Sequence, residues 1–364
     1  MPIDSSRFRA GDYVEVRSRG EILRTLDPEG RLDGLPFMPE MLRFCGRQFR
    51  VAARAHKTCD FVNKTGVRAL PACVHLEGLR CDGSAHGGCQ AQCTYFWKDA
   101  WLKFPGEPAT ANDAGPAFCT EERLWSATTA AHSAGNNGDT VYVCQATRLP
   151  DFTRPLSPWN PRQYLEDYRS GNVASLSRFL PRAAYRGFDA LVNLGVGLGR
   201  PLRASYDVFQ KVLGRRRLYP GTPGRLPAGA KTPAADLNLQ PGELVRVKDH
   251  ARILETIDAY GMNRGMTFSA EMAPYCGGVF RVLGRVNRII DEKTGRMIRM
   301  KTPCIVLQGV VCRAQFNRRM IFCPRATYSY WREIWLERVG PAPQPVAATA
   351  PTLVASNQAV RTSS

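Results

Sequence analysis

The sequence has no long hydrophobic run. No segment of its 364 residues approaches the roughly 20 consecutive apolar residues that a membrane-spanning helix needs. The first nine residues also lack the apolar core of a signal peptide. These absences predict a cytoplasmic protein, in which thiols stay reduced and clustered cysteines favour metal binding or reactivity over disulfides.

Acidic residues are scarce relative to basic ones. Fifty Lys and Arg face 32 Asp and Glu, which gives a formal net charge of +18. This surplus predicts an anionic partner: a membrane surface, nucleic acid or an acidic polymer. A charge that serves only solubility is the alternative.

Motifs of the common enzyme classes are missing. The sequence contains no glycine-rich phosphate loop ending in Lys-Ser/Thr and no G-x-S-x-G elbow. Residues 195–199 (GVGLG) stop short of a dinucleotide-binding fingerprint. Cys59 and His56 are the residue types of a nucleophilic pair, but their proximity in sequence sets no geometry. We therefore expect a non-catalytic protein.

One unit occurs twice. Residues 11–81 align without a gap with residues 242–312, at a constant offset of 231. Of the first 41 paired positions, 17 are identical, including the Glu-Met pair at 40–41 and 271–272 and the Cys-Gly pair at 45–46 and 276–277. Such a repeat defines the architecture of the chain.

The residue pattern of each copy predicts short strands separated by turns. A strand at 13–16 or 244–247 precedes a helical turn, a glycine corner and a second strand, and 291–295 predicts a hairpin loop. This order resembles a small SH3-like barrel at the level of fold alone. We predict a mainly β protein with an α connector, built from two tandem SH3-like small β-barrels.

The repeat divides the chain into six predicted regions. They are a first Cys-rich repeat (1–104), its loop-rich extension (105–160), a basic helical connector (161–217), a Pro/Gly linker (218–241), a second repeat (242–339) and a disordered tail (340–364).

Four thiols recur in both copies. Cys45, Cys73 and Cys81 pair with Cys276, Cys304 and Cys312, and Cys323 pairs with either Cys89 or Cys93. Eight residues of straight strand would hold Cys73 and Cys81 roughly 26 Å apart. The recurring thiols therefore form one site only if Gly78 or Gly309 bends the chain.

The densest group is Cys81, His86, Cys89 and Cys93 in a glycine-rich loop. Tetrahedral zinc takes four such ligands, and an iron–sulfur cluster takes four thiolates. The spacing C-x7-C-x3-C is typical of neither a zinc ribbon nor a ferredoxin. Zinc is the first prediction, an iron–sulfur cluster the second, and buried or reactive thiols the alternative. The fourth ligand is left open among His86, Cys59, His75, Cys119 and Cys144.

Two further sets of residues could bind a partner. Trp97 and Trp101 match Trp331 and Trp335, and each pair is expected either to close a core or to offer a stacking surface. The connector is a basic amphipathic helix that either docks on the protein, lies on an anionic membrane or contacts nucleic acid. Its candidate contact residues are Arg178, Arg182, Arg186, Arg215, Arg216 and Arg217.

Two segments carry a family resemblance. CVHLEGLRCDGSAHGGC at 73–89 and YWREIWL at 330–336 resemble an uncharacterised bacterial family of duplicated, cysteine-rich proteins, over residues from about 10 to 339. The resemblance implies a bacterial origin and brings no activity or ligand with it.

Together these features predict a metal-stabilised binding or adaptor protein. It would act on an anionic partner or at the inner membrane surface, with a nucleic-acid-binding protein and an iron–sulfur redox protein as alternatives.

Overall fold

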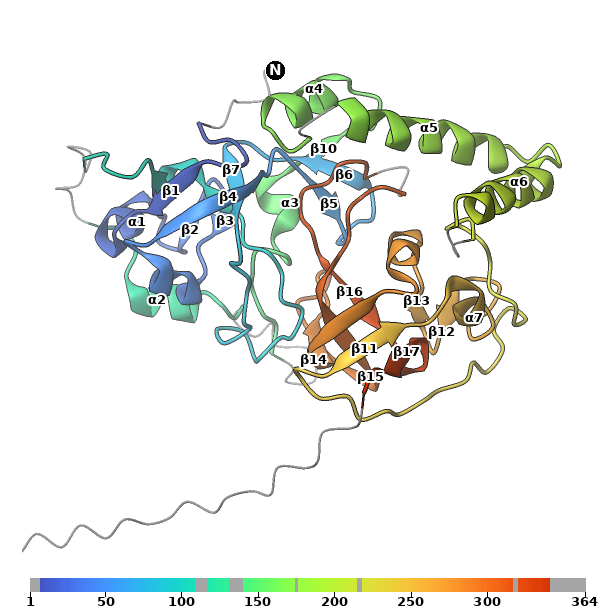
Figure 1. Cartoon of the computed structure of the whole chain (residues 1–364). Coiled ribbons are helices and arrows are strands. Elements are labelled where there is room, and N and C mark those ends of the chain that lie inside the picture. The colour runs from blue at the N-terminus through green and yellow to red at the C-terminus, as the bar shows by residue number, and fades with distance from the viewer. Residues whose placement is uncertain are drawn as a thin grey trace, which may run out of the picture.

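A computed structural model describes residues 7–108, 117–130, 140–173, 176–214, 218–316 and 320–340. Within them the protein is mainly β, with several small antiparallel sheets and a helical segment between two β-rich halves (Figure 1). We call residues 7–156 the first half and residues 242–340 the second half.

A five-stranded antiparallel sheet forms the centre of the first half, in the order β8-β7-β4-β1-β9. Its strands are β1 (Tyr13–Val16), β4 (Gln48–Arg54), β7 (Cys73–Leu76), β8 (Trp97–Lys98) and β9 (Leu102–Lys103). The connections contain α1 (Arg19–Thr25), the pair β2 (Arg31–Leu32) and β3 (Leu35–Pro36), and two 3-10 turns, η1 (Pro39–Phe44) and η2 (Asp99–Trp101). Ser18 and Glu21 form a capping box that begins α1, as their spacing favours.

The second half contains a sheet of the same strand order, β16-β15-β14-β11-β17. Its elements are β11 (Leu244–Val247), α7 (His250–Leu254), β12 (Met262–Asn263), β13 (Met266–Thr267), η4 (Ala270–Tyr275), β14 (Val279–Ile290), β15 (Met297–Val311), β16 (Tyr328–Trp331), η5 (Glu333–Trp335) and β17 (Leu336–Arg338). Val14 pairs with Phe49 in the first sheet and Val245 with Phe280 in the second. Both pairs obey the offset of 231, so the two sheets share their register here.

Neither sheet closes into a barrel, which corrects the predicted closed architecture. The edge strands β8 and β9 are joined through η2 but do not hydrogen-bond to each other, and β16 and β17 repeat this arrangement around η5. Each edge strand is only two to four residues long, so it offers few main-chain groups for pairing.

The halves differ where one long hairpin is predicted. In the second half, β14 and β15 run on as a long hairpin around the turn at 291–295, as expected. In the first half the equivalent hairpin is broken, and β5 (Lys57–Asp60) and β6 (Gly66–Ala69) form a separate sheet with β10 (Arg154–Leu156). This break carries Cys59 away from the first sheet.

The four paired tryptophans are buried in the two cores. Trp97, Trp101, Trp331 and Trp335 each have no exposed surface, so none offers a face to a base or a sugar and the predicted stacking surface is wrong. The indole N–H of Trp101 donates to Thr25 Oγ1 at 3.1 Å, and that of Trp335 donates to Thr256 Oγ1 at 2.9 Å. The same closure therefore occurs in both halves.

The segment that connects the two halves in the sequence is helical. Its helices are α4 (Arg162–Arg169), α5 (Leu176–Val192) and α6 (Gly199–Val212), and the loop-rich extension adds α2 (Glu121–Ser126) and α3 (Leu149–Phe152). Glu166 and Asp167 of α4 form ion pairs with Arg54 at 2.6 Å and Lys57 at 2.5 Å, so α4 is fastened to the first half. Among the described residues, no helix combines the length and apolarity that crossing a membrane would require.

The Thr–Trp closure can be tested by removing one hydroxyl at a time. We expect Thr25→Val and Thr256→Val each to lower the free energy of unfolding by about 1–3 kcal/mol, because a buried indole N–H loses its acceptor. Thr→Ser at either position keeps the hydroxyl and is expected to cost less. Urea unfolding followed by tryptophan fluorescence measures both. Equal losses for Val and Ser would contradict a role for the hydrogen bond.

Candidate metal centre

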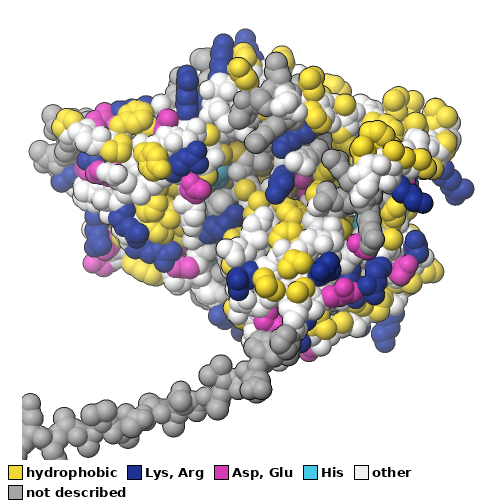
Figure 2. All heavy atoms as spheres, viewed as in Figure 1, with side chains coloured by type: hydrophobic (Ala, Val, Ile, Leu, Met, Phe, Trp, Pro, Cys, Tyr) yellow, Lys and Arg dark blue, Asp and Glu magenta, His cyan; other side chains and the backbone are white. Residues whose placement is uncertain are grey.

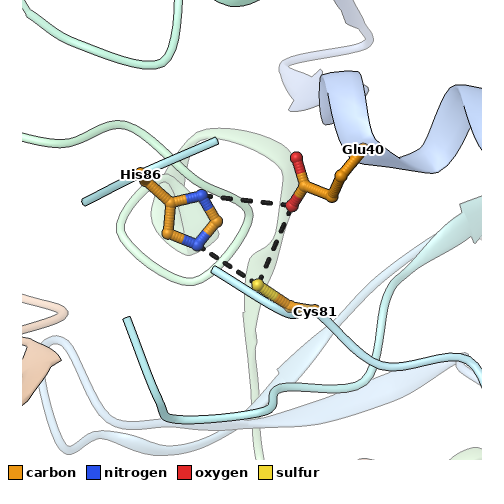
Figure 3. A group of neighbouring side chains, drawn as sticks. All are labelled: Glu40, Cys81 and His86. Carbon is orange, nitrogen blue, oxygen red and sulfur yellow. Dashed lines mark hydrogen bonds and ion pairs between the residues drawn. The ribbon is translucent and has the colours of Figure 1, made fainter. Parts of the chain in front are cut away.

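Three metal-ligating side chains meet at the first glycine-rich loop. Glu40 lies on η1, and Cys81 and His86 lie on the loop after β7 (Figure 3). Cys81 Sγ is 3.2 Å from His86 Nε2 and 3.8 Å from Glu40 Oε1, and His86 Nδ1 is 4.0 Å from the same oxygen. Within the described part of the chain, this is the group whose carboxylate, thiol and imidazole ligand atoms all lie within 4.8 Å of one another.

Glycines let the loop turn back on itself. Gly83, Gly87 and Gly88 all have positive φ, and the N–H groups of His86 and Gly88 both donate to the Gly83 carbonyl. A Cβ on Gly83 would lie only 2.1 Å from the Cys89 carbonyl oxygen. Only glycine allows this approach, which brings His86 back over Cys81.

Burial controls the protonation of the group. It raises the pKa of the Glu40 carboxyl and of the Cys81 thiol, and it lowers the pKa of His86 to about 4. Without a cation the imidazole is therefore neutral near pH 7. Glu40 Oε2 and His86 Nδ1 are buried without a hydrogen-bond partner. Buried polar atoms normally have partners, so these two are suited to bind a ligand.

More thiols line the adjacent cavity. It encloses about 40 Å³, room for an ion with little water, and Cys81, His86, Cys89, Cys93 and Cys144 all contribute to its wall. Burial raises the pKa of Cys93 to about 12 and that of Cys144 to about 11. The four residues of the predicted dense cluster thus share one cavity, together with Cys144 from the loop-rich extension.

Hydrogen bonds to the second half hold the loop. Within the loop, Cys81 N–H donates to the Cys93 carbonyl at 2.8 Å. From the second half, Ile290 N–H of β14 donates to Cys89 Sγ at 3.3 Å. Gln90 Oε1 accepts from Arg288 N–H at 3.1 Å, and Arg80 donates to the Ala326 carbonyl at 2.8 Å. The cavity therefore depends on both halves.

Other predicted ligands lie elsewhere. His75 is a core residue: its Nδ1 bonds to the Tyr95 carbonyl at 2.8 Å and its ring packs on Phe96. Cys119 is buried in the hydrophobic core of the first half. Cys73 is in the same core and is separated from the site because β7 ends at Leu76 and the chain turns at Gly78.

The thiols of the second half do not form a matching centre. Cys304 packs against Met266 and Met300, and Cys276 is buried at the glycine corner. Cys312 lies near Glu271, as Cys81 lies near Glu40, but Glu271 Oε1 accepts the N–H of Phe316. One oxygen of this carboxylate therefore accepts a backbone N–H, whereas Glu40 Oε1 accepts the Tyr95 hydroxyl at 3.2 Å.

The structure resolves which residue corresponds to Cys323. Cys312 N–H donates to the Thr327 carbonyl, as Cys81 N–H donates to the Cys93 carbonyl. Cys93 is therefore equivalent to Thr327, and counting back four residues makes Cys89 the counterpart of Cys323. Cys323 lies instead beside Cys59, which is thus removed from the first cluster.

Glu40 was missed by the ligand prediction, which considered only cysteine and histidine. Its signal is present in the sequence, because Glu40 and Glu271 recur in the Glu-Met pair of each copy. That recurrence gives no indication of which side chain the carboxylate faces.

Of the predicted basic contact residues, two are engaged within the protein. Arg182 lies over the Phe322 ring, and Arg186 lies over Trp159 and donates to the Tyr164 hydroxyl. The side chain of Arg178 and all of Arg215, Arg216 and Arg217 lie outside the described residues.

Comparison of the chain with protein-family models gives no match, and neither does comparison with curated protein sequences or with solved structures. The resemblance to a duplicated, cysteine-rich family therefore stays a prediction.

The glycine loop can be tested by a matched pair of substitutions. Gly78 and Gly83 both have φ of +74°, but a Cβ on Gly78 would meet nothing within 4 Å. We expect Gly78→Ala to cost about 1–2 kcal/mol for its backbone conformation. Gly83→Ala should cost a further ~1–3 kcal/mol because of the clash with Cys89. Chemical unfolding measures the difference, and equal costs would show that the loop does not close as described.

Proposed function

We propose that the protein is a non-catalytic binding protein that lies on an anionic membrane surface, with a zinc ion stabilising its first half. The observation that carries this proposal is a pair of helices, α5 and α6, whose outward faces are apolar and exposed. The surrounding charge and the metal-ligating group supply the remaining support.

From Leu180 onward, the outward face of α5 is apolar. Leu180 and Leu191 on α5 are 63% and 54% exposed, and Leu194, just after the helix ends, is 62% exposed. The small residues Ala183, Ala184, Gly187 and Ala190 lie between them. These positions recur every three or four residues and therefore share one side of the helix. Hydrophobic side chains gather over α5 and α6 at the upper right of Figure 2.

The turn and α6 extend this apolar surface. Val196 and Leu198 in the turn are exposed, and so are Val208, Phe209 and Val212 on α6, the last at 79%. Soluble proteins rarely expose so many large apolar side chains in one segment unless the surface binds something. The helices are amphipathic rather than uniformly apolar, which is typical of segments that lie in the plane of a bilayer interface.

The charge around this face is positive. Residues 176–214 contain six Arg and Lys and two Asp, a net of +4. Both acids are turned inward. Asp189 accepts a hydrogen bond from the Tyr219 hydroxyl, and Asp207 accepts one from the backbone N–H of Tyr219. Arg200 and Lys211 are exposed beside the apolar residues. Apolar insertion combined with cationic side chains fits an anionic lipid headgroup layer.

The zinc proposal rests on the Glu40, Cys81 and His86 group. Cys89 and Cys93 line the same cavity and would supply the remaining thiolates, as the sequence pattern predicts. Zinc favours this mixture of sulfur, imidazole and carboxylate ligands. Such an ion would contribute folding free energy to a loop that has little apolar core of its own.

We further propose that both halves are variants of a small SH3-like barrel that arose by duplication. The shared strand order, the shared register and the 3-10 turn between the last two strands of each sheet support this.

Membrane binding is tested by sedimentation with vesicles of phosphatidylglycerol and phosphatidylcholine. We expect the protein to bind these vesicles and to bind pure phosphatidylcholine at least tenfold more weakly, since the cationic contribution is lost. Phe209→Asp and Leu194→Asp should each reduce binding by about tenfold or more, because an inserted side chain is replaced by a charge.

Tyr260→Ser is the control, since Tyr260 is 68% exposed but lies outside the helices. Equal binding by all variants would contradict the proposal. Binding to DNA or RNA in place of vesicles would favour the nucleic-acid alternative, and a Phe209-dependent dimer would make the face a protein interface.

The metal is tested by elemental analysis of protein purified anaerobically without chelator. We expect about one equivalent of zinc, lost together with thermal stability in Cys81→Ser, His86→Ala and Cys89→Ser. Cys119→Ser should keep the zinc, because this thiol lies outside the cavity. Iron with a visible absorption band would favour the iron–sulfur alternative, and full zinc in His86→Ala would contradict this ligand set.

A further inference from the structure

Two cysteines that are far apart in the sequence meet between the halves. Cys59 lies on β5, and Cys323 lies on the segment between β15 and β16, and their side chains are hydrogen-bonded. Cys59 is 4% exposed, whereas Cys323 is only partly buried. Cys323 is therefore the more exposed residue of the two.

The hydrogen bond makes the two thiols unequal. Cys59 donates to Cys323, which raises the pKa of Cys59 and lowers that of Cys323. A thiolate is the nucleophilic form of cysteine, so Cys323 is the reactive member. Cys59 stays protonated beside it and is placed to react second.

Two buried cations lie next to the pair. Arg325 Nη1 is 4.0 Å from Cys59 Sγ and 3.4 Å from the Cys59 carbonyl oxygen, and Arg325 is 1% exposed. Lys57 is fully buried on the same strand as Cys59 and acts electrostatically on Cys323. Positive groups beside a thiol favour the thiolate.

A second metal site fits these thiols less well. Cys312 is a further thiol close enough to raise the pKa of Cys323 electrostatically. Yet the three sulfurs do not converge within 4.8 Å in the part of the chain that the structure describes, as Glu40, Cys81 and His86 do. Tetrahedral zinc requires such convergence of four ligands. The geometry favours chemistry between two thiols.

We propose that Cys59 and Cys323 are a redox pair that hydrogen peroxide converts into a disulfide joining the two halves. The Cys323 thiolate attacks one peroxide oxygen, the O–O bond breaks, and the leaving hydroxide takes a proton to become water. Cys59 then attacks the resulting sulfenic acid, the S–S bond forms and a second water leaves. Two thiols are oxidised, one peroxide is reduced, and a small thiol such as glutathione reverses the change.

This assignment is independent of zinc and of membrane binding. It concerns cysteines outside the proposed metal cavity and a segment distant in sequence from the outward face of α5 and α6. Its consequence would be a covalent tie between β5 and the segment before β16, which would hold the halves together under oxidation.

The test is peptide mapping of the full-length protein after treatment with one equivalent of peroxide. Free thiols are alkylated, the protein is digested without reductant, and disulfide-linked peptides are identified by mass spectrometry. We expect a Cys59–Cys323 linked peptide, the loss of two free thiols and their return with glutathione. Cys323→Ser should abolish this loss, and Cys119→Ser should leave it unchanged.

Zinc content measured on the same samples separates this proposal from the previous one. Cys59 and Cys323 should link whether or not the protein contains zinc. If Cys59 and Cys323 are still fully alkylated after other thiols have oxidised, the proposed redox pair is wrong. A disulfide between Cys323 and Cys312 would also contradict it. Loss of a metal equivalent in Cys59→Ser would make these thiols ligands and overturn it also. Peptide mapping of the wild-type protein after peroxide treatment tests the Cys59–Cys323 disulfide even if a variant fails to fold.

Discussion

Hydrogen bonds between the cysteine-rich loop and the second half join the two halves around the metal-ligating group. The loop donates and accepts through Cys89, Gln90 and Arg80, and its partners lie on β14 and near Ala326. These bonds are made across the sequence, so neither the cavity nor the pairing of Cys59 with Cys323 would exist in an isolated half. The metal-ligating group and the redox pair therefore share one structural requirement, although their chemistry differs.

Buried charge explains why the two groups differ. Arg325 lies between them: it pairs with Glu292 at 3.2 Å, contacts Cys59, and also acts on Cys93. On the Cys59 side, Arg325 and Lys57 supply positive charge that stabilises a thiolate. On the Cys81 side, Glu40 brings a carboxylate within reach of a thiol and an imidazole, which favours a cation. Arg325 thus borders one environment suited to a metal ion and another suited to thiolate chemistry.

The outward faces of α5 and α6 carry neither group. The inner faces of these helices bury Asp189 and Val192 and pack Tyr185 against Tyr219, so the fold occupies one side of each helix and leaves the other apolar and unpaired. Leaving large apolar side chains in water costs free energy unless a partner removes them from it. A surface protein whose fold is completed by a bilayer would meet this requirement.

Alternation and turn residues are enough to predict the local elements. The repeat predicts the strands β1, β4, β11 and β14, the glycine corners and the hairpin of β14 with β15, because alternation and turn residues act over a few positions. It also brought Cys81, His86, Cys89 and Cys93 together, since they lie within one short loop whose glycines allow it to curl.

Contacts between residues that are distant in the sequence depend on tertiary packing. Glu40 reaches Cys81 from another element, Cys59 leaves the first cluster because β5 separates from β4, and all four tryptophans turn inward. The sheets stay open because the edge strands of each, joined through a 3-10 turn, do not hydrogen-bond to each other. Sequence periodicity reports which face of an element is apolar but not what covers that face, and long-range packing alone chooses the partner.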